Sequence, residues 1–162
     1  MNRTTKIART RHASGGIEPP GLPPWATTMR RVFRHPAISW SLLAGYCLLI
    51  FIQSSLPSVD MGTDLPGFDK LLHLAAYTLM AVLACRAFAT RPGLQSALAL
   101  FLAGFAFTLL FGLSDEWHQS FVPARTADVW DWAADGLGAL LGAGFTSRRL
   151  RPTGRRGGTF PR

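Results

Sequence analysis

Four polar side chains at the start of one apolar stretch could together bind a ligand or transfer a proton. Asp69, His73 and Tyr77 follow one another at intervals of four residues, and Lys70 stands beside the first of them. Because residues four apart lie on one face of a helix, the carboxylate, the imidazole and the phenol are expected to share a face. Asp69 and His73 are therefore candidate catalytic residues, and Lys70 and Tyr77 are candidate ligand-binding residues. A satisfied hydrogen bond between helices is an equally good interpretation of His73.

A second set of carboxylates follows helical spacing towards the C-terminal end of the chain. The intervals between Asp128, Asp131, Asp135, Gly138 and Gly142 are three, four, three and four residues, so the acids continue into a stripe of glycines. A stripe of small residues allows another helix to approach closely in a membrane. We therefore expect these acids to point into a helix bundle and to bind ligand, although helix capping alone would explain Asp128.

Glu116 is the first candidate for a general acid or base. It ends a series of residues spaced four apart, which consists of Gly104, Thr108, Gly112 and Glu116 itself. Gln119 follows three residues later and is a candidate ligand-binding residue. The next connection is expected to contribute His118 and Arg125, and Arg125 is suited to positioning an anionic group. Asp115 is expected to be solvated or to cap a helix.

These residue types do not form a recognisable metal or cofactor motif. Histidines and carboxylates are present, but the chain lacks a tight ligand spacing such as His-Glu-x-x-His. We therefore expect no metal and no cofactor. Two interpretations of the polar residues stay open, a water-filled pocket with a binding or chemical role and a salt-bridged latch that holds helix ends together.

The elements that must position these side chains are membrane-spanning helices. Of the 162 residues, 48% are hydrophobic and only 16% are charged, which is typical of a membrane protein. Apolar stretches of sufficient length to cross a bilayer begin after Pro36, near Asp69 and at Leu94. The four expected helices cover residues 37–53, 69–89, 94–113 and 128–146, the last being the least obvious by hydropathy because of its acids.

The charges are strongly separated along the chain. The net charge is +8, and fifteen of the 17 Lys and Arg residues lie in segments 1–36, 86–91 and 148–162, whereas eight of the nine acids lie between or beside these segments. Basic residues near helix ends stay on the cytoplasmic side. The pattern predicts a multi-pass protein of the inner or plasma membrane with both termini in the cytoplasm, in contact with membrane lipids and not with nucleic acid.

These observations predict an all-α fold, an integral membrane four-helix bundle. Residues 1–35 are expected to form a disordered cytoplasmic tail, residues 36–147 the four-helix domain and residues 148–162 a basic cytoplasmic tail. Association into an oligomer stays open.

Several motifs in order along residues 38–146 resemble those of the VanZ-like membrane proteins. They are Gln53–Pro57, Asp69–His73 with Tyr77, Ser114–Gln119, Pro123-x-Arg125, Asp128 with Asp131, and Asp135-Gly136-x-Gly138. Where this family's last pattern usually carries Asn, the chain has Asp135, which adds a charge at depth.

The resemblance implies a protein of the bacterial envelope and, through the founding member of the family, resistance to the glycopeptide teicoplanin. It implies no molecular mechanism, so enzymatic activity stays open. Our leading hypothesis is that the outward-facing polar residues bind or modify a lipid-linked or glycopeptide-like envelope molecule. The alternative is a non-catalytic scaffold or assembly protein whose charged residues form a structural latch.

Overall fold

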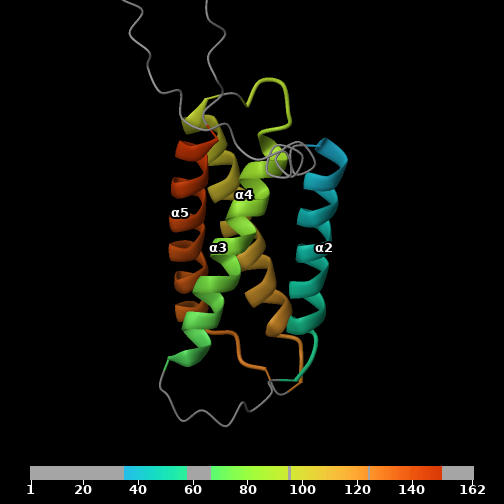
Figure 1. The fold of residues 1–162 in the computed structure, drawn as a ribbon. Coiled ribbons are helices and arrows are strands. Elements are labelled where there is room, and N and C mark those ends of the chain that lie inside the picture. The colour runs from blue at the N-terminus through green and yellow to red at the C-terminus, as the bar shows by residue number, and fades with distance from the viewer. Residues whose placement is uncertain (1–34, 58–66, 95, 124, 151–162) are drawn as a thin grey trace, which may run out of the picture.

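The computed structural model describes residues 35–57, 67–94, 96–123 and 125–150 of the chain (Figure 1). These residues form four helices, and no strand occurs among them. In chain order the helices are α2 (Pro36–Ser54), α3 (Phe68–Phe88), α4 (Ala97–Gln119) and α5 (Val129–Arg149). The predicted all-α fold is therefore confirmed. The predicted disorder of the tails falls on residues 1–34 and 151–162, which lie outside the described residues.

Local sequence signals account for the helix starts. Pro36 occupies the first turn of α2, where its missing N–H costs no hydrogen bond. The Ser96 side chain accepts a hydrogen bond from the backbone of Ala99, 3.0 Å away, at the start of α4. Gly67, with a φ of 80°, supplies the left-handed turn that precedes α3.

The prediction for the third helix was wrong at its C-terminal end. The expected end was near Leu113, but α4 continues through the polar sequence to Gln119, so that His118 lies in the helix and not in the connection. The reason is that Asp115, Glu116 and Gln119 are buried against the other helices. Their polarity therefore marks an inward face of the helix and not its end. Helix α5 also extends to Arg149, three residues beyond the expected end.

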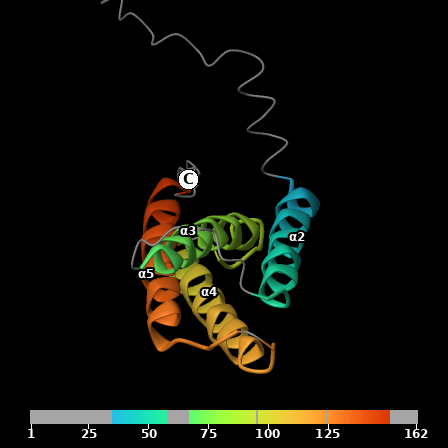
Figure 2. The same cartoon turned by 90° about the horizontal axis from the view of Figure 1, so that it is seen from below.

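Helix α3 lies between the other helices and makes its closest approach to α5 (Figures 1 and 2). Gly138 and Gly142 face the α3 backbone. A Cβ atom added at Gly138 would lie 2.9 Å from the backbone nitrogen of Thr78, and one added at Gly142 would meet the Thr78 carbonyl oxygen. The predicted packing role of the glycine stripe is thus confirmed.

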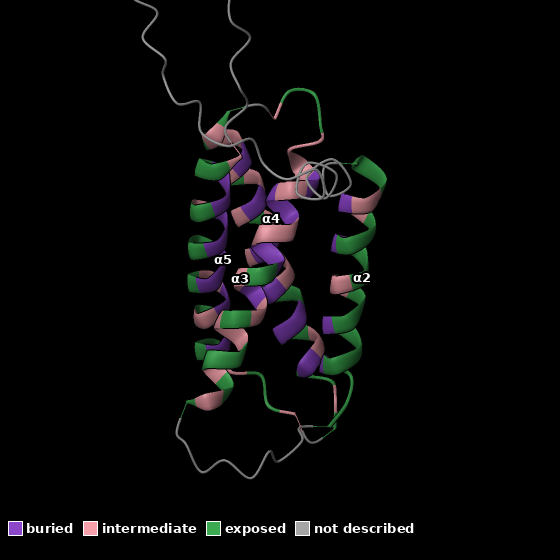
Figure 3. Cartoon of the chain, in the orientation of Figure 1, coloured by how far each residue is buried: buried purple, intermediate pink, exposed green. Residues whose placement is uncertain are grey.

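The outward surface of the bundle is apolar. The outward sides of the helices are exposed and the facing sides are buried (Figure 3). Exposed side chains on every helix include large hydrophobic ones, whereas buried positions include several polar and charged residues. Helices α2, α3 and α4 are each long and apolar enough to cross a membrane. An apolar exterior around a partly polar interior is the arrangement expected of helices in lipid. The chain is therefore a membrane protein.

Helix α5 has the length of a membrane span but a lower hydropathy. It contains 21 residues, and its acids Asp131 and Asp135 are both buried among the neighbouring helices. Its exposed side is nevertheless apolar and includes Trp130, Leu137 and Phe145. We therefore treat α5 as the fourth helix of the membrane bundle, with its polar face turned inward.

Candidate functional site

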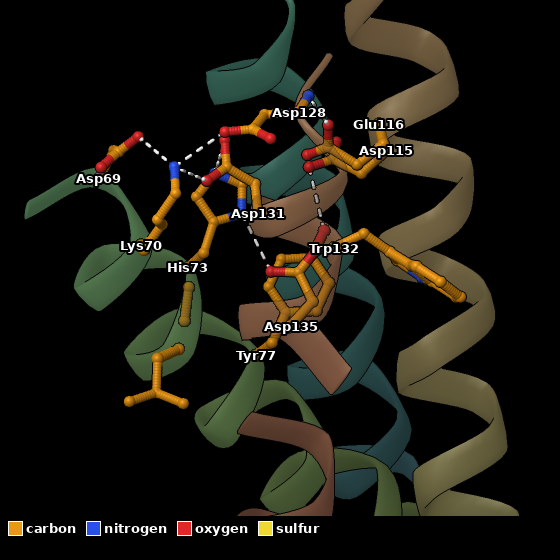
Figure 4. Close-up of polar contacts among 12 residues, drawn as sticks. Asp69, Lys70, His73, Tyr77, Asp115, Glu116, Asp128, Asp131, Trp132 and Asp135 are labelled. Carbon is orange, nitrogen blue, oxygen red and sulfur yellow. Dashed lines mark hydrogen bonds and ion pairs between the residues drawn. The ribbon is translucent and has the colours of Figure 1, made fainter. Parts of the chain in front are cut away.

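The polar residues meet where α3 and α5 begin and α4 ends (Figure 4). We call this group the acidic cluster, and it comprises Asp69, Lys70, His73, Tyr77, Asp115, Glu116, Gln119, Asp128, Asp131 and Asp135. The basic residues Arg91, Arg148 and Arg149 lie near the opposite ends of these helices. The polar faces of the three helices therefore come together at one end of the bundle.

Lys70 connects the outer carboxylates of the cluster. Its Nζ lies 3.0 Å from Asp69 Oδ2, 2.9 Å from Asp128 Oδ2 and 3.0 Å from Asp131 Oδ1. The Lys70 side chain is 34% exposed, and that of Asp69 is 58% exposed. Lys70 and Asp69 therefore form the rim of the cluster, and Lys70 ties α3 to the start of α5.

Asp128 both caps α5 and joins it to α4. Its Oδ1 accepts a hydrogen bond of 2.9 Å from the backbone of Trp130, which confirms the expected capping role. Its own backbone N–H donates to Glu116 Oε2, also at 2.9 Å. The hydrogen bond from Trp130 lowers the pKa of the Asp128 carboxyl, and the contact with Lys70 lowers this pKa further. Asp128 is therefore held as a carboxylate at neutral pH.

His73 lies deeper in the cluster, against α5. Its Nδ1 is 2.9 Å from Oδ1 of the fully buried Asp135, and its Nε2 is 3.9 Å from Asp131 Oδ2. The imidazole is parallel to the Tyr77 ring, with 6.2 Å between the ring centroids. Asp135 thus contributes a carboxylate that contacts His73, at the position where the resemblance leads one to expect an amide.

Asp115 is a buried member of the cluster that the sequence interpretation missed. It is 5% exposed, and its Oδ2 accepts hydrogen bonds from the Tyr77 hydroxyl at 3.0 Å and from Gln119 Nε2 at 3.1 Å. The expectation that Asp115 is solvated is therefore wrong. Thr108, Gly112, Asp115 and Gln119 are spaced four, three and four, and this interval pattern was the available signal.

Two carboxylate oxygens in the cluster have no hydrogen-bond partner within the part of the chain that the structure describes. They are Glu116 Oε1 and Asp135 Oδ2, and both are buried. Gly112 leaves room for the second oxygen, because a Cβ atom there would lie 2.8 Å from Asp135 Oδ2. Buried polar atoms cost free energy unless something satisfies them, so these two oxygens point to a ligand, a water or a proton.

Carboxylates exceed cationic groups in the cluster. Lys70 contacts Asp69, Asp128 and Asp131, and the three inner carboxylates are those of Asp115, Glu116 and Asp135. Within the described residues, the contact of His73 with Asp135 brings a basic nitrogen to these inner acids. Chemically, the inner part of the cluster suits hydrogen-bond donors and cations, and its acids and imidazole can exchange protons.

The structure also brings together a set of metal-ligating groups from three helices. His73, Glu116 and Asp135 each offer one ligand atom, and these atoms lie within 4.8 Å of one another. The expectation of no metal rested on ligand spacing along the sequence. Ligands contributed by α3, α4 and α5 leave no such spacing to detect.

Arg125 lies apart from the acidic cluster. Its Nε donates to the Leu56 carbonyl oxygen at 2.8 Å, and its Nη2 donates to the Gln53 carbonyl oxygen at 2.7 Å. His118, at the end of α4, contacts Ser55 Oγ at 3.0 Å and packs on the ring of Phe51. Both predicted residues therefore contact the C-terminal end of α2.

Replacing Arg125 by methionine is expected to loosen the end of α2. Two backbone carbonyls would lose their charged donor, at about 1–2 kcal/mol for a partly exposed site. Hydrogen–deuterium exchange in detergent should accelerate for amides near Gln53 and Leu56, while exchange at the centre of α3 stays unchanged. Unchanged exchange near Leu56 would contradict this role. The exchange rate of Arg125→Lys should fall between those of wild type and Arg125→Met.

Comparison with known proteins bears directly on the predicted resemblance. No curated protein and no solved structure matches the chain significantly. The model of one family, described as VanZ/LLP1, matches residues 20–150, about four fifths of the 162 residues. The matched region includes all four helices and every residue of the acidic cluster. The chain therefore belongs to the VanZ/LLP1 family.

Proposed function

We propose that this VanZ-type membrane protein binds the polar headgroup of a bacterial envelope component, lipid-linked or glycopeptide-like, at the acidic cluster. The observation that carries the proposal is the pair of buried carboxylate oxygens, Glu116 Oε1 and Asp135 Oδ2, which have no partner among the described residues. A bundle held together by its charges alone would be expected to satisfy these oxygens within itself.

The chemistry of the cluster favours a headgroup rich in hydrogen-bond donors. Lys70 is already shared among three carboxylates, so it is a poor site for a bare anion. Hydroxyl and amine groups can donate directly to Glu116 and Asp135. Sugars and peptides of the envelope, and glycopeptides such as teicoplanin, carry both kinds of group. Glu116 is the group best placed to act as an acid or base on a bound headgroup.

The distribution of charge supports an outward-facing site. The ends of the helices opposite the cluster carry Arg86, Arg91, Arg148 and Arg149. Because basic residues near membrane helices stay on the cytoplasmic side, we place both termini in the cytoplasm of the inner or plasma membrane. The acidic cluster then faces the outside, where lipid-linked intermediates and glycopeptides are found.

A non-catalytic scaffold is the second candidate function. It is favoured by the connections that the cluster makes between helices, since Lys70 ties α3 to α5 and the Asp128 backbone ties α5 to Glu116 on α4. In that case the cluster would be a latch, and its loss would remove the protein from the membrane rather than change ligand binding.

Glu116→Gln separates these two functions. The amide keeps the shape of the side chain, and its oxygen can still accept the hydrogen bond from Asp128 N–H. We expect normal accumulation in the membrane, together with the teicoplanin and envelope-stress susceptibility of a deletion strain. Immunoblots of membranes and susceptibility assays beside wild type measure both quantities.

Ser114→Ala is the matched control, because Ser114 is exposed on the same helix and bonds only to the Phe111 carbonyl oxygen in the described structure. It should leave accumulation and susceptibility at wild-type levels. Normal accumulation and normal susceptibility of Glu116→Gln, in a strain whose deletion is susceptible, would contradict the binding function. Lost accumulation would favour the latch.

A further inference from the structure

We infer that His73, Glu116 and Asp135 form a binding site for one divalent transition-metal cation of the Zn²⁺ or Mn²⁺ class. Imidazole nitrogen and carboxylate oxygen are the donors that such cations take in proteins, and here each of three helices supplies one of them. The inference deepens the proposed function. The role given to the cation, which is to bind the headgroup, rests on that proposed function. Binding of the cation can be measured independently of that function.

The separations of the ligand atoms are close to those around a small cation. Two ligands held about 2.1 Å from a metal at roughly a right angle are about 3 Å apart. His73 Nδ1 and Asp135 Oδ1 are 2.9 Å apart. Ligands of a tetrahedral cation are about 3.4 Å apart, and the three ligand atoms here lie within 4.8 Å of one another, which is wider than a closed site. The ligand atoms would therefore have to approach one another by up to about 1.4 Å to close the set around a tetrahedral metal.

The unpartnered oxygens are an independent observation that points to a cation. Glu116 is 7% exposed and Asp135 is fully buried, yet Glu116 Oε1 and Asp135 Oδ2 have no hydrogen-bond partner within the described residues. The other oxygen of Glu116 is engaged by Asp128 N–H. The other oxygen of Asp135 faces His73 Nδ1 at 2.9 Å, so a metal bound by Nδ1 would replace that hydrogen bond and be held by both oxygens of Asp135. A metal would satisfy both oxygens without requiring a further donor from the protein.

Carboxyl groups outnumber basic nitrogens in the inner cluster. Asp115, Glu116 and Asp135 are buried, and within the described residues His73 is the group that faces them with a basic nitrogen. The Tyr77 hydroxyl and the Gln119 amide, which bond to Asp115, are neutral. Residues 58–66, which precede α3, contain no Lys, Arg or His. A divalent cation would supply the missing positive charge.

Neighbouring groups lie beside the proposed ligands. A metal-bound histidine usually directs its second nitrogen towards a carboxylate or a carbonyl oxygen. Asp131 Oδ2 lies 3.9 Å from His73 Nε2, which is beyond hydrogen-bond distance, so this carboxylate would have to move closer to orient the ring. The Asp128 backbone holds Glu116 Oε2, which leaves Oε1 free for the metal. Three protein ligands leave at least one coordination position for water or for a ligand from outside.

A bound cation would also define the class of molecule that the site accepts. Without it, the excess of carboxylates repels an anionic headgroup. With it, the open coordination position can take an oxygen of a phosphate or a carboxylate group. With the metal bound, Glu116 and Asp135 are its ligands, so they no longer accept from hydroxyl or amine groups and Glu116 no longer acts as an acid or base. The deepened proposal replaces those direct contacts by an envelope molecule whose phosphate or carboxylate oxygen binds the metal.

Metal content of the purified full-length protein tests the site. The protein in detergent is stripped with EDTA, equilibrated with Zn²⁺ alone or Mn²⁺ alone, passed over a desalting column and analysed by elemental mass spectrometry. We expect about one metal per chain for wild type, and loss of most of this metal for Asp135→Asn and His73→Gln, each of which removes a proposed ligand. Asp69→Asn removes the same charge from the exposed rim and should keep the wild-type metal content.

The outcomes separate the site from the proposed function. A wild-type protein with no more metal than Asp135→Asn, or an equal loss in Asp69→Asn, would overturn the metal site. If Asp135→Asn does not purify as a monodisperse protein, Glu116→Gln replaces it under the same criteria. Metal binding by wild type, combined with normal susceptibility of Glu116→Gln cells, would overturn the proposed function and leave the site intact. A wild-type protein that binds no metal, combined with deletion-like susceptibility of Glu116→Gln cells, would overturn the metal site and leave the proposed function intact.

Discussion

Replacing Gly142 by alanine is expected to remove most of the protein from the membrane. The added methyl group would meet the Thr78 carbonyl oxygen and would lie 2.9 Å from Ala81 Cβ, both on α3. Backbone and Cβ atoms cannot rotate away, so α5 must separate from α3. Overpacking of this kind costs about 1–3 kcal/mol and sometimes more. Immunoblots of membranes and thermal unfolding in detergent should both show the loss.

Gly144→Ala is the matched control for this prediction. Gly144 lies in the same helix, two residues away, and a Cβ atom built on it has nothing within 4 Å. Alanine there should leave accumulation unchanged or raise it slightly, because alanine is the better helix former. Equal accumulation of the two variants would show that α3 and α5 do not depend on this close approach.

The glycine stripe illustrates which features of the fold were predictable. Intervals of three and four residues placed Asp131 and Asp135 on the same face as Gly138 and Gly142, and a face of small residues has to pack against another helix. The inward direction of the two acids followed from that spacing alone. Their burial in the structure confirms it.

The end of α4 was predicted wrongly because the polarity of residues 114–119 was given more weight than their helical spacing. A run of polar residues after an apolar stretch normally indicates that a helix has left the membrane. Here Asp115, Glu116 and Gln119 remain helical and buried because polar groups on α3 and α5 face them. Polarity along one sequence segment does not reveal whether partners on other segments are present.

Contacts between distant segments account for the remaining differences. The Arg125 side chain bonds to backbone carbonyl oxygens at the end of α2, and every residue type offers such oxygens. The sequence can therefore suggest that Arg125 binds an acceptor but cannot identify which one. The same limit applies to His73, Glu116 and Asp135, whose proximity depends on how three helices pack.

Replacing Lys70 by methionine is expected to destabilise the contact between α3 and α5. Methionine preserves most of the volume of the side chain but leaves Asp131, whose side chain is 11% exposed, without the ammonium group 3.0 Å away. Removing the partly exposed Lys70 from the more deeply buried Asp131 costs about 1–2 kcal/mol after allowance for solvent screening. The unfolding midpoint in detergent should fall accordingly, and Lys70→Arg, which keeps the charge, should retain most of the stability.

A double variant distinguishes the loss of attraction from the cost of an unpaired charge. In Lys70→Met combined with Asp131→Asn, the deep partner of Lys70 no longer carries a charge, so stability should recover part of what Lys70→Met loses. Asp69→Asn in place of Asp131→Asn should give no such recovery, because Asp69 is solvated at the rim. Recovery in both double variants would mean that total charge, and not the buried pair, sets the stability. Since Lys70 engages three carboxylates at one end of the bundle, recovery specific to Asp131 would identify which of its contacts joins the two helices.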